Sequence, residues 1–497
     1  MSPKTSRRGF LRGLGSAAAV GVTARAGRSE GPTGTRGKRR NIVFILTDDL
    51  RFDAIGGFGN PFFRTPQLDA LARNGIWLEN AFVTTSLCSP SRASILTGQY
   101  AHAHRVMDNR TRLSPEIAMF PRELQKAGYE TAFVGKWHMG GASDAPRPGF
   151  DRWVSFRGQG VYNNPTFNVD GRKEKRRGYV TDLITDYAID VIKARRSKPF
   201  MLYVSHKAVH ADFQPVARYK DKYKGKAYPP PASMADVDEN YRGKPDWVRR
   251  QRHSWHGVDG MYNKKRDFDT VVQEYAEALL ALDEGVGRIV HALREQGQLD
   301  STFLVFTSDN GFLFGEHGLI DKRVMYEPSI RVPLIVHCPE LFAAGQRRAE
   351  MILNIDFAPT FIEAAGGAVP ASMQGQSFFG LLSGTRRHWR EDFLYEYFWE
   401  RSYPQTPTVL GVRTDTHKFI QCHGVWDRYE LYDLRADPDE MHNLLAEFRI
   451  TTQGGTLDRL IATHARGDVK RIYDDMQRRL RRLLRETGCA AEPNWRT

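Results

Sequence analysis

Short and almost wholly apolar runs recur along the chain, and each ends in polar residues. Five such runs stand at 41–49, 129–140, 199–210, 301–311 and 332–339. Continuous apolar runs of this length are typical of strands that are buried on both faces of a sheet. Stretches with helical periodicity, notably 66–75 and 275–297, stand between them. The alternation predicts an α/β fold with a large, mixed but mostly parallel sheet flanked by helices.

The pattern changes past residue 385. FLYEYFWE (393–400), TVLGVRTDTHKFIQC (408–422) and DRYELYDL (427–434) alternate like antiparallel strands, and VKRIYDDMQRRLRRLLRE (469–486) reads as a basic amphipathic helix. We therefore predict a larger α/β domain over 41–384 and a smaller C-terminal α+β subdomain over 385–497. Residues 211–268 have little periodicity, and we expect them to form an irregular insertion at the wall of a substrate pocket.

The N-terminus has the features of an export signal. Arg7 and Arg8 precede a weak apolar run that ends in Ala24-Arg25-Ala26. This segment resembles a bacterial twin-arginine signal peptide with its cleavage pattern. We expect residues 1–26 to be the signal, 27–40 a linker, and the protein to be exported by the twin-arginine machinery to the periplasm or beyond. A disordered basic tail is the alternative. A membrane span is not expected, because no run reaches the roughly 20 apolar residues that a bilayer needs.

Charge and cysteine content narrow the classes of partner. The formal net charge of the 497 residues is +14, which favours acidic partners such as a sulfated or phosphorylated polymer. Nucleic acid is not expected, because no recognised binding motif accompanies the charge. The four cysteines are Cys88, Cys338, Cys422 and Cys489. No two form a C-x-x-C pair, which excludes a zinc ribbon, and a disulfide among the last three stays open.

Acidic side chains follow two of the predicted strands. Asp48 and Asp49 end one run, and Asp309 and Asn310 end another. Ligands of α/β sheets bind beyond the carboxyl ends of the strands, so we expect these four side chains to converge. Three carboxylates and an amide oxygen suit a hard divalent cation, calcium or magnesium. Taken singly, each pair is more often a turn or a helix cap.

Cationic and titratable side chains occupy similar places. Those that we select as candidates are Arg92, Lys136, His138, His210 and Lys322. Gathered round a metal ion, they would bind a tetrahedral anion, and a histidine could protonate a leaving alkoxide. Each alone is more often a surface charge or a hydrogen-bonded histidine. His206 and His317 are interpreted as structural.

Cys88 stands in an unusual segment, TTSLCSPSRASILTGQ (84–99). Three ordinary interpretations compete: a buried inert thiol, a thiolate nucleophile whose pKa Arg92 lowers, and a metal ligand. None of them explains the proline and the hydroxyl-rich residues that surround the thiol.

Four blocks carry a family resemblance. They are CSPSRASILTG (88–98), GKWHMG (135–140), TSDNGFLFGEHGLIDK (307–322) and YEPSIRVPLIVHCP (326–339). In this order they resemble the sulfatase family of the alkaline-phosphatase-like superfamily, from about residue 41 to 445. The resemblance implies that a formylglycine-generating enzyme oxidises Cys88 to Cα-formylglycine, and that the segment around Cys88 is the recognition tag for that enzyme.

The resemblance also implies a role for each candidate. The expected ligands of Ca²⁺, with Mg²⁺ less expected, are Asp48, Asp49, Asp309, Asn310 and the modified Cys88. Arg92 would hold the formylglycine hydrate, Lys136 and Lys322 the sulfate, and His138 would act as the base that collapses the sulfated intermediate. His210 would lie near the leaving oxygen. Val209 replaces the family's usual proline before it, which leaves His206 as a weaker candidate for the same role.

Residues 395–444 resemble N-acetylglucosamine-6-sulfatases, which implies a sulfated carbohydrate substrate from a glycosaminoglycan or mucin. Aromatic residues in this segment would stack on sugars, or FLYEYFWE is simply a strand that packs the subdomain. Two other functions remain open: a phosphoester or phosphonate hydrolase of the same superfamily, and a non-catalytic binder of sulfated polysaccharide. The intact candidate set argues against the binder, because a binder needs no modifiable cysteine.

Overall fold

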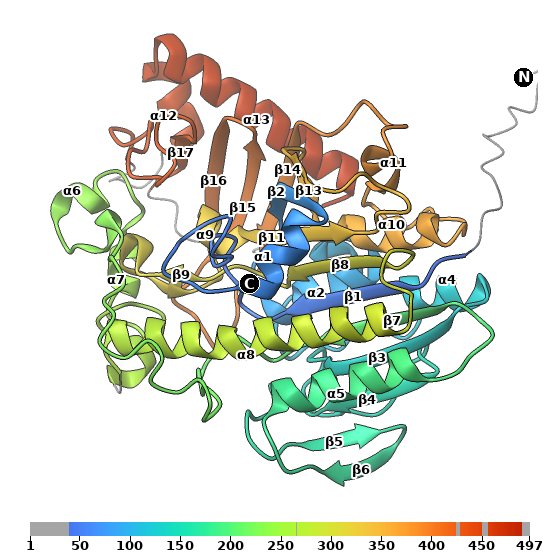
Figure 1. The fold of residues 1–497 in the computed structure, drawn as a ribbon. Helices are drawn as coiled ribbons and strands as arrows, with labels where there is room; N and C mark the ends of the chain where they lie inside the picture. The colour runs from blue at the N-terminus through green and yellow to red at the C-terminus, as the bar shows by residue number, and fades with distance from the viewer. Residues whose placement is uncertain (1–38, 265, 424–427, 450–455, 490–497) are drawn as a thin grey trace, which may run out of the picture. The chain divides into compact units, whose positions relative to one another are not determined.

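A mixed eleven-stranded sheet organises the described part of the computed structural model, residues 39–264, 266–423, 428–449 and 456–489 (Figure 1). In spatial order its strands are β12 (Gln346–Arg348), β2 (Ile76–Phe82), β11 (Arg331–His337), β8 (Phe303–Ser308), β1 (Ile42–Thr47), β7 (Phe200–Ser205), β3 (Glu130–Lys136), β4 (Arg152–Phe156), β5 (Thr166–Val169) and β6 (Arg172–Lys175); β13 (Ile352–Leu353) also pairs with β2.

The centre of the sheet is parallel. Strands β8, β1, β7, β3 and β4 run in one direction, whereas β11 is antiparallel to both β8 and β2, and β5 is antiparallel to β4 and β6. The five apolar runs of the sequence correspond to β1, β3, β7, β8 and β11. The predicted mixed and mostly parallel sheet is confirmed.

Helices cover both faces of this sheet, because alternate strand residues point to opposite sides. The helices on the face of Val43 and Ile45 are α1 (Pro66–Arg73), α5 (Val180–Lys193) and α8 (Phe268–Glu295). Figure 1 shows α5 and α8 lying across the front of the sheet. The face of Phe44 and Leu46 is covered by α2 (Cys88–Thr97), α4 (Phe120–Lys126) and α10 (Phe357–Ala364).

The C-terminal part forms a second, antiparallel sheet of four strands. These are β14 (Asp392–Tyr397), β15 (Thr408–Thr414), β16 (His417–His423) and β17 (Glu430–Asp433), with helices α12 (Leu457–His464) and α13 (Gly467–Thr487) after them. The predicted antiparallel pattern is therefore present. Its apolar side chains belong to the same buried cluster as Phe44 and Leu46, so this sheet shares a core with the eleven-stranded sheet.

The predicted insertion at 211–268 contains only short helical turns. They are η1 (Ala232–Met234), α6 (Asp238–Tyr241), α7 (Asp246–Gln251) and η2 (Met261–Lys264). The remaining short elements are α3 (Ala101–His104), β9 (Leu313–Phe314), η3 (Glu316–Gly318), β10 (Ile320–Asp321), α9 (Glu327–Ile330), η4 (Asn354–Asp356) and α11 (Phe379–Leu382).

Parallel pairing brings the carboxyl ends of four neighbouring strands to one level. Leu46 of β1 and Gly135 of β3 both pair with Ser205 of β7, and Thr47 pairs with Ser308 of β8. The residues that follow these strands therefore meet at one edge of the sheet, as predicted.

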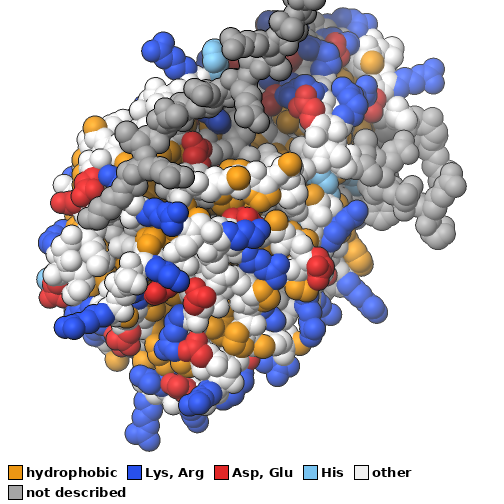
Figure 2. Space-filling model, turned by 90° about the vertical axis from the view of Figure 1, so that its right-hand side faces the viewer, with side chains coloured by type: hydrophobic (Ala, Val, Ile, Leu, Met, Phe, Trp, Pro, Cys, Tyr) orange, Lys and Arg blue, Asp and Glu red, His pale blue; other side chains and the backbone are white. Residues whose placement is uncertain are grey.

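Basic residues are spread over the surface. On the face shown in Figure 2, Lys and Arg side chains are interspersed with acidic and hydrophobic ones. Among the helices that the structure describes, none has the length and apolar character needed to span a bilayer. The predicted signal and nearly all of the predicted linker lie outside the described residues.

Candidate active site

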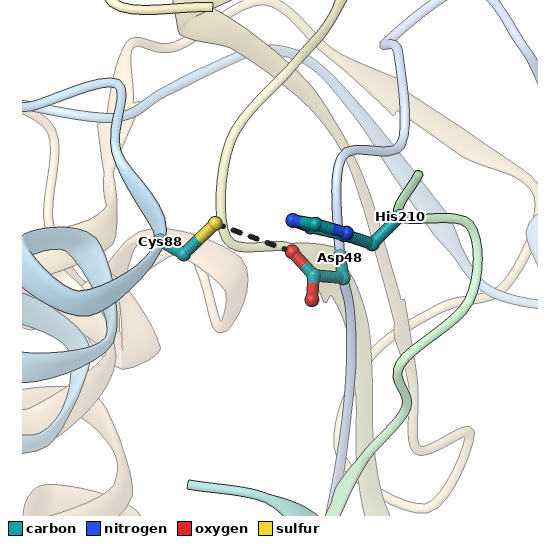
Figure 3. Close-up of side chains that lie close together, drawn as sticks. All are labelled: Asp48, Cys88 and His210. Carbon is teal, nitrogen blue, oxygen red and sulfur yellow. Dashed lines mark hydrogen bonds between the residues drawn. The ribbon is translucent and has the colours of Figure 1, made fainter. Parts of the chain in front are cut away.

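The structure brings the predicted site residues together at the carboxyl edge of the sheet. Asp48 and Asp49 follow β1, Lys136 ends β3, and His210 lies in the loop after β7. Asp309 and Asn310 follow β8, Lys322 follows β10, and Cys88 and Arg92 lie on the first turns of α2. Figure 3 shows the side chains of Cys88, Asp48 and His210 converging from three separate segments.

Three buried carboxylates form the centre of the site. Asp48, Asp49 and Asp309 each offer an oxygen within 4.8 Å of the others. Positive side chains offset part of their charge: Lys136 contacts Asp48, and Lys322 Nζ lies 2.6 and 2.7 Å from the two carboxylate oxygens of Asp49. Like charges this close in a dry environment repel strongly unless cations surround them.

The carboxylates differ in their affinity for protons. Burial, followed by the negative charge of Asp48, raises the pKa of Asp309 to about 7. Burial also opposes ionisation of Asp48, but Lys136 holds the pKa of that carboxyl well below its usual range. Burial is thus the main reason that Asp309 resists ionisation, although Arg92, Lys136 and Lys322 each pair with one of the three carboxylates.

The donor set fits a hard divalent cation. Asn310 Oδ1 is buried and has no hydrogen-bond partner among the described residues, although such an atom normally has one. The nitrogen of the same side-chain amide donates a hydrogen bond to Asp49 Oδ1 at 2.6 Å. An unpartnered carbonyl oxygen beside three carboxylates is the ligand chemistry of calcium or magnesium.

Arg92 ties the helix to the sheet. Its Nε and Nη2 both lie 2.8 Å from Asp309 Oδ2, and its Nη1 donates to the carbonyl of Lys136 and to Ser205 Oγ, at 2.9 and 2.6 Å. The guanidinium is buried and its geometry is fixed from two sides, as suits a residue that positions reacting groups.

Cys88 opens helix α2, and its thiol is fully buried 3.5 Å from Asp48 Oδ1. Burial raises the pKa of this thiol well above its ordinary value. An unmodified Cys88 is therefore protonated at neutral pH, which contradicts the interpretation as a thiolate nucleophile. Its place at a helix N-terminus turns the positive end of the helix dipole toward the site, which favours an anion there.

The two candidate histidines flank the cysteine. Ser89 Oγ lies 3.3 Å from His138 Nδ1, and His210 Nε2 lies 3.9 Å from Asp49 Oδ2. Burial, and then the charge of Lys136, lowers the pKa of both histidines well below the usual range, so both are neutral at pH 7. The side chain of His210 is 16% exposed, so it lies where a substrate can reach it.

The structure separates His210 from His206. His206 is fully buried, and neither of its ring nitrogens has a hydrogen-bond partner in the described part of the chain. The charge that influences its ring is that of Asp182 on α5, away from the carboxylates. His317 is likewise buried against the ring of Tyr326.

Several neighbours of the site were not predicted. Ser205 contacts Arg92, and Asp321 Oδ1 lies 3.3 Å from Lys322 Nζ. Lys207 is buried near the same centre, and burial followed by Lys136 lowers its pKa to about 8. Lys207 and Asp321 stand in the same polar segments as His210 and Lys322. Their place in these segments could have marked them as candidate site residues.

Comparison with known proteins identifies the family. The family model described as Sulfatase matches residues 40–368. The chain belongs to the sulfatase family. A second model, described as N-sulphoglucosamine sulphohydrolase, C-terminal, matches residues 315–464 of this sulfatase. The protein is thus a sulfuric ester hydrolase, and its family generally uses a formylglycine and a metal ion.

Two relatives of this sulfatase have names that refer to a sulfated amino sugar. An N-acetylglucosamine-6-O-sulfatase of Bacteroides thetaiotaomicron is 34% identical over 82% of this chain and 83% of its own length. The N-acetylglucosamine-6-sulfatase of Homo sapiens is 28% identical, over 89% of this chain and 88% of its own.

Solved structures confirm the alkaline-phosphatase-like fold. A protein in complex with its substrate D-glucosamine-2-N,6-O-disulfate superposes with a TM-score of 0.82 at 30% identity, over 93% of this chain and all of the other. A phosphonate monoester hydrolase of Agrobacterium radiobacter superposes with a TM-score of 0.72 over 89% of this chain and 96% of its own, at 20% identity, which supports the fold alone.

Proposed function

We propose that this sulfatase removes the 6-O-sulfate of N-acetylglucosamine in a sulfated glycan, a glycosaminoglycan or mucin. The observation that carries the proposal is the place of Cys88, whose buried side chain faces three carboxylates ringed by Arg92, Lys136 and Lys322. The choice of sugar rests on the relatives named N-acetylglucosamine-6-sulfatases.

The chemistry begins with a modified Cys88. A formylglycine-generating enzyme would convert its side chain to an aldehyde, which hydrates to a geminal diol. One hydroxyl of the diol passes its proton to a carboxylate of the site, for which Asp309 with its raised pKa is suited, and the oxygen attacks sulfur while the bond from sulfur to the sugar oxygen breaks. His210 protonates the departing oxygen. His210 is neutral in the free protein, so this role requires that the bound anionic ester raise its pKa.

The second hydroxyl of the diol completes the cycle. His138 takes its proton, the carbonyl double bond re-forms, and sulfate leaves with the electron pair of the carbon–oxygen bond. An unmodified cysteine or serine has no second hydroxyl for this step. Lys136 and Lys322 would hold the sulfate oxygens, because their ammonium groups are buried beside the attack position.

The proposed ligands of the divalent cation are Asp48, Asp49, Asp309, Asn310 and the modified Cys88. When bound, a calcium ion supplies Lewis acidity and charge neutralisation. Lys136 and Lys322 now contact the oxygens of Asp48 and Asp49, so a cation would compete for these oxygens and leave the ammonium groups to bind an anion.

We also propose that the protein is exported, on the basis of Arg7, Arg8 and the cleavage pattern at Ala24–Ala26. Twin-arginine export carries folded proteins, so Cys88 would be modified before export.

A substrate panel tests the proposal. Purified enzyme from a host that makes the modifying enzyme would be assayed on N-acetylglucosamine-6-sulfate, iduronate-2-sulfate, 4-nitrophenyl sulfate and a phosphonate monoester. The expected order of kcat/KM places the 6-sulfated amino sugar first, and Cys88→Ala abolishes turnover of every substrate. A higher kcat/KM for the phosphonate would favour the phosphonate hydrolase, and binding of sulfated glycan without turnover would favour the binder.

A further inference from the structure

The turn that follows strand β14 is joined to the segments of the active site. The backbone nitrogen of Arg323, the residue after Lys322, donates to the carbonyl of Ser86 at 3.1 Å, and Ser86 is two residues before Cys88. The Nε of Arg323 lies 2.9 Å from Glu400 Oε1, and both side chains are buried. This ion pair therefore connects the turn to Lys322 and to the segment of Cys88.

The turn itself is closely packed. The backbone nitrogen of Tyr403 donates to the carbonyl of Glu400 at 2.9 Å, and the guanidinium of Arg323 lies 4.1 Å from the centroid of the Tyr403 ring. The same ring lies 4.5 Å from the imidazole of His256, whose Nε2 is 3.3 Å from Asp321 Oδ2. Side chains that project from this turn are therefore held at a fixed place beside the catalytic residues.

Trp399 lies at the start of this turn and is 48% exposed. Its backbone nitrogen donates to Thr408 Oγ1 at 3.0 Å, and its Nε1 donates to the carbonyl of Pro404 at 3.3 Å. These two hydrogen bonds orient the indole while about half of its surface stays accessible. An oriented, accessible indole is a flat apolar surface on which the C–H face of a sugar ring can stack.

Arg401, two residues further on, adds a positive charge to the same turn. Its side chain is exposed, and in the part of the chain that the structure describes its guanidinium has no acidic partner. Arg323, by contrast, is paired with both Asp321 and Glu400. A free guanidinium can bind a carboxylate or a sulfate through two parallel hydrogen bonds. An apolar ring and a free cation on one anchored turn match a sugar that carries an acidic group.

We propose that Trp399 and Arg401 form a subsite for the sugar next to the one that loses its sulfate. The ring of this second sugar stacks on the indole of Trp399, and its carboxylate or sulfate pairs with Arg401. The inference rests on the proposed function, and it names the substrate as a glycan with an anionic second sugar. Both residues lie outside the buried set of Cys88, Lys136 and Lys322, so they bind the glycan and take no part in the chemical step.

The test compares N-acetylglucosamine-6-sulfate alone with three disaccharides in which it is linked to galactose, to galactose-6-sulfate or to glucuronic acid. Trp399→Ala should lower kcat/KM about tenfold for all three disaccharides, through a higher KM with kcat unchanged, and leave the monosaccharide within about twofold. Trp399→Phe keeps a flat ring and should lose less than Trp399→Ala. The melting temperature of each variant shows that it is folded.

Arg401→Gln tests the charged part of the subsite. It should lower kcat/KM about two- to fivefold for a disaccharide with an acidic second sugar and leave the galactose disaccharide unchanged. The disaccharide that responds distinguishes a sulfate from a carboxylate. Arg387→Gln is the matched control, because Arg387 is also exposed without an acidic partner among the described residues but precedes β14, at the opposite end of the strand from Trp399. It should change no substrate ratio.

Three results would overturn the inference: no loss in Trp399→Ala, an equal loss on the monosaccharide and the disaccharides, or a wild type that prefers the monosaccharide to every disaccharide. Binding of the disaccharides to Cys88→Ala, measured by calorimetry, separates these failures from failure of the proposed function. A wild type that hydrolyses none of the four sugars contradicts the proposed function. An approximately tenfold weaker affinity on adding Trp399→Ala to Cys88→Ala would still support the subsite, and an unchanged affinity would overturn it.

Discussion

The thiol of Cys88 lies 3.5 Å from Oδ1 of Asp48, although the two residues come from the start of a helix and the end of a central strand. A buried thiol with a raised pKa beside a carboxylate is a poor nucleophile. The same position suits an oxygen nucleophile made from that side chain, next to a divalent cation.

Removal of one carboxylate should remove the response to calcium. In the wild-type protein, calcium at about 100 times its Kd should raise the free energy of unfolding by about 2.7 kcal/mol over the chelator-treated protein. In Asp309→Asn this increase should be largely lost, together with the activity. Thermal unfolding with calcium or with chelator measures the difference.

Asp283→Asn is the matched control for this experiment. Asp283 is also a buried aspartate, but it accepts hydrogen bonds from the first backbone amides of α1, at Gln67 and Leu68. Its replacement should lower the overall stability and leave the calcium-dependent increase intact. Equal calcium responses in the wild type and in Asp309→Asn would argue against the metal site.

The two neighbouring histidines should behave differently. His210→Gln should lower kcat by a factor of about 10² to 10⁴, the usual contribution of a general acid or base. His206→Gln should keep kcat within a few-fold, because His206 has no contact with the carboxylates or Cys88. Steady-state kinetics on folded protein distinguishes them, and a larger loss in His206→Gln would reverse the assignment.

The sequence was sufficient to predict much of this site because its residues follow buried parallel strands. Once NIVFILTDD and STFLVFTSDNG are assigned as neighbouring strands, Asp48 and Asp309 must lie close together. The pattern did not show strand β2 at Ile76–Phe82, because the half-buried polar residues Glu79 and Asn80 interrupt its apolar run. It also missed β5 and β6, which lie at the sheet margin.

Gly135 should not tolerate a side chain. Its φ is 121°, and a Cβ atom there would lie 1.8 Å from the carbonyl oxygen of Ser205 on the adjacent strand. Gly135→Ala should therefore lower the free energy of unfolding by about 3 kcal/mol or more and displace Lys136. Gly171→Ala is the control, because its φ is 93° and nothing lies within 4 Å of the added atom. It should cost about 1 kcal/mol. Urea unfolding of both variants compares the two costs, and similar values would contradict this packing.

An ion pair that anchors the C-terminal helix should make stability depend on alkaline pH. His102 Nδ1 lies 2.7 Å from Glu396 Oε2, and its Nε2 lies 2.9 Å from the carbonyl of Thr487 at the end of α13. Burial alone would lower the pKa of His102, but its hydrogen bonds to Cys489 and Glu396 outweigh burial and raise the pKa from 6.5 to about 10.

The folded-state pKa of His102 is higher than the unfolded one, so the contribution of this pair is complete below pH 6.5. It is lost as the pH rises to about 10. We expect the free energy of unfolding to fall by about 2 kcal/mol over this range, a value reduced for partial solvent screening. In His102→Gln this part of the decrease should be absent. Urea unfolding across the range checks it, and the same slope in both proteins would show that other groups cause the decrease.

Contacts between segments that are not both strands of the predicted parallel sheet could not be predicted from the sequence. The pairing of His102 with Glu396 is an example, because neither hydrophobic periodicity nor motif spacing links their two segments. The aromatic segment FLYEYFWE illustrates the same limit. Tyr395 and Tyr397 lie in strand β14 and are buried, whereas Trp399 lies just beyond the end of the strand and is exposed. The sequence pattern does not show where the strand ends, so it does not tell the buried rings from the exposed one.

The central claim is that Cys88 is converted to formylglycine, and the mass of the tryptic peptide Asn74–Arg92 tests it most directly. The protein would be prepared from a host that makes the modifying enzyme, with Cys88→Ala as the reference for a side chain that cannot be oxidised to an aldehyde. We expect part of the population to have the mass of an aldehyde in place of the thiol, in proportion to the sulfatase activity of each preparation. An intact thiol in every molecule of an active preparation would contradict it.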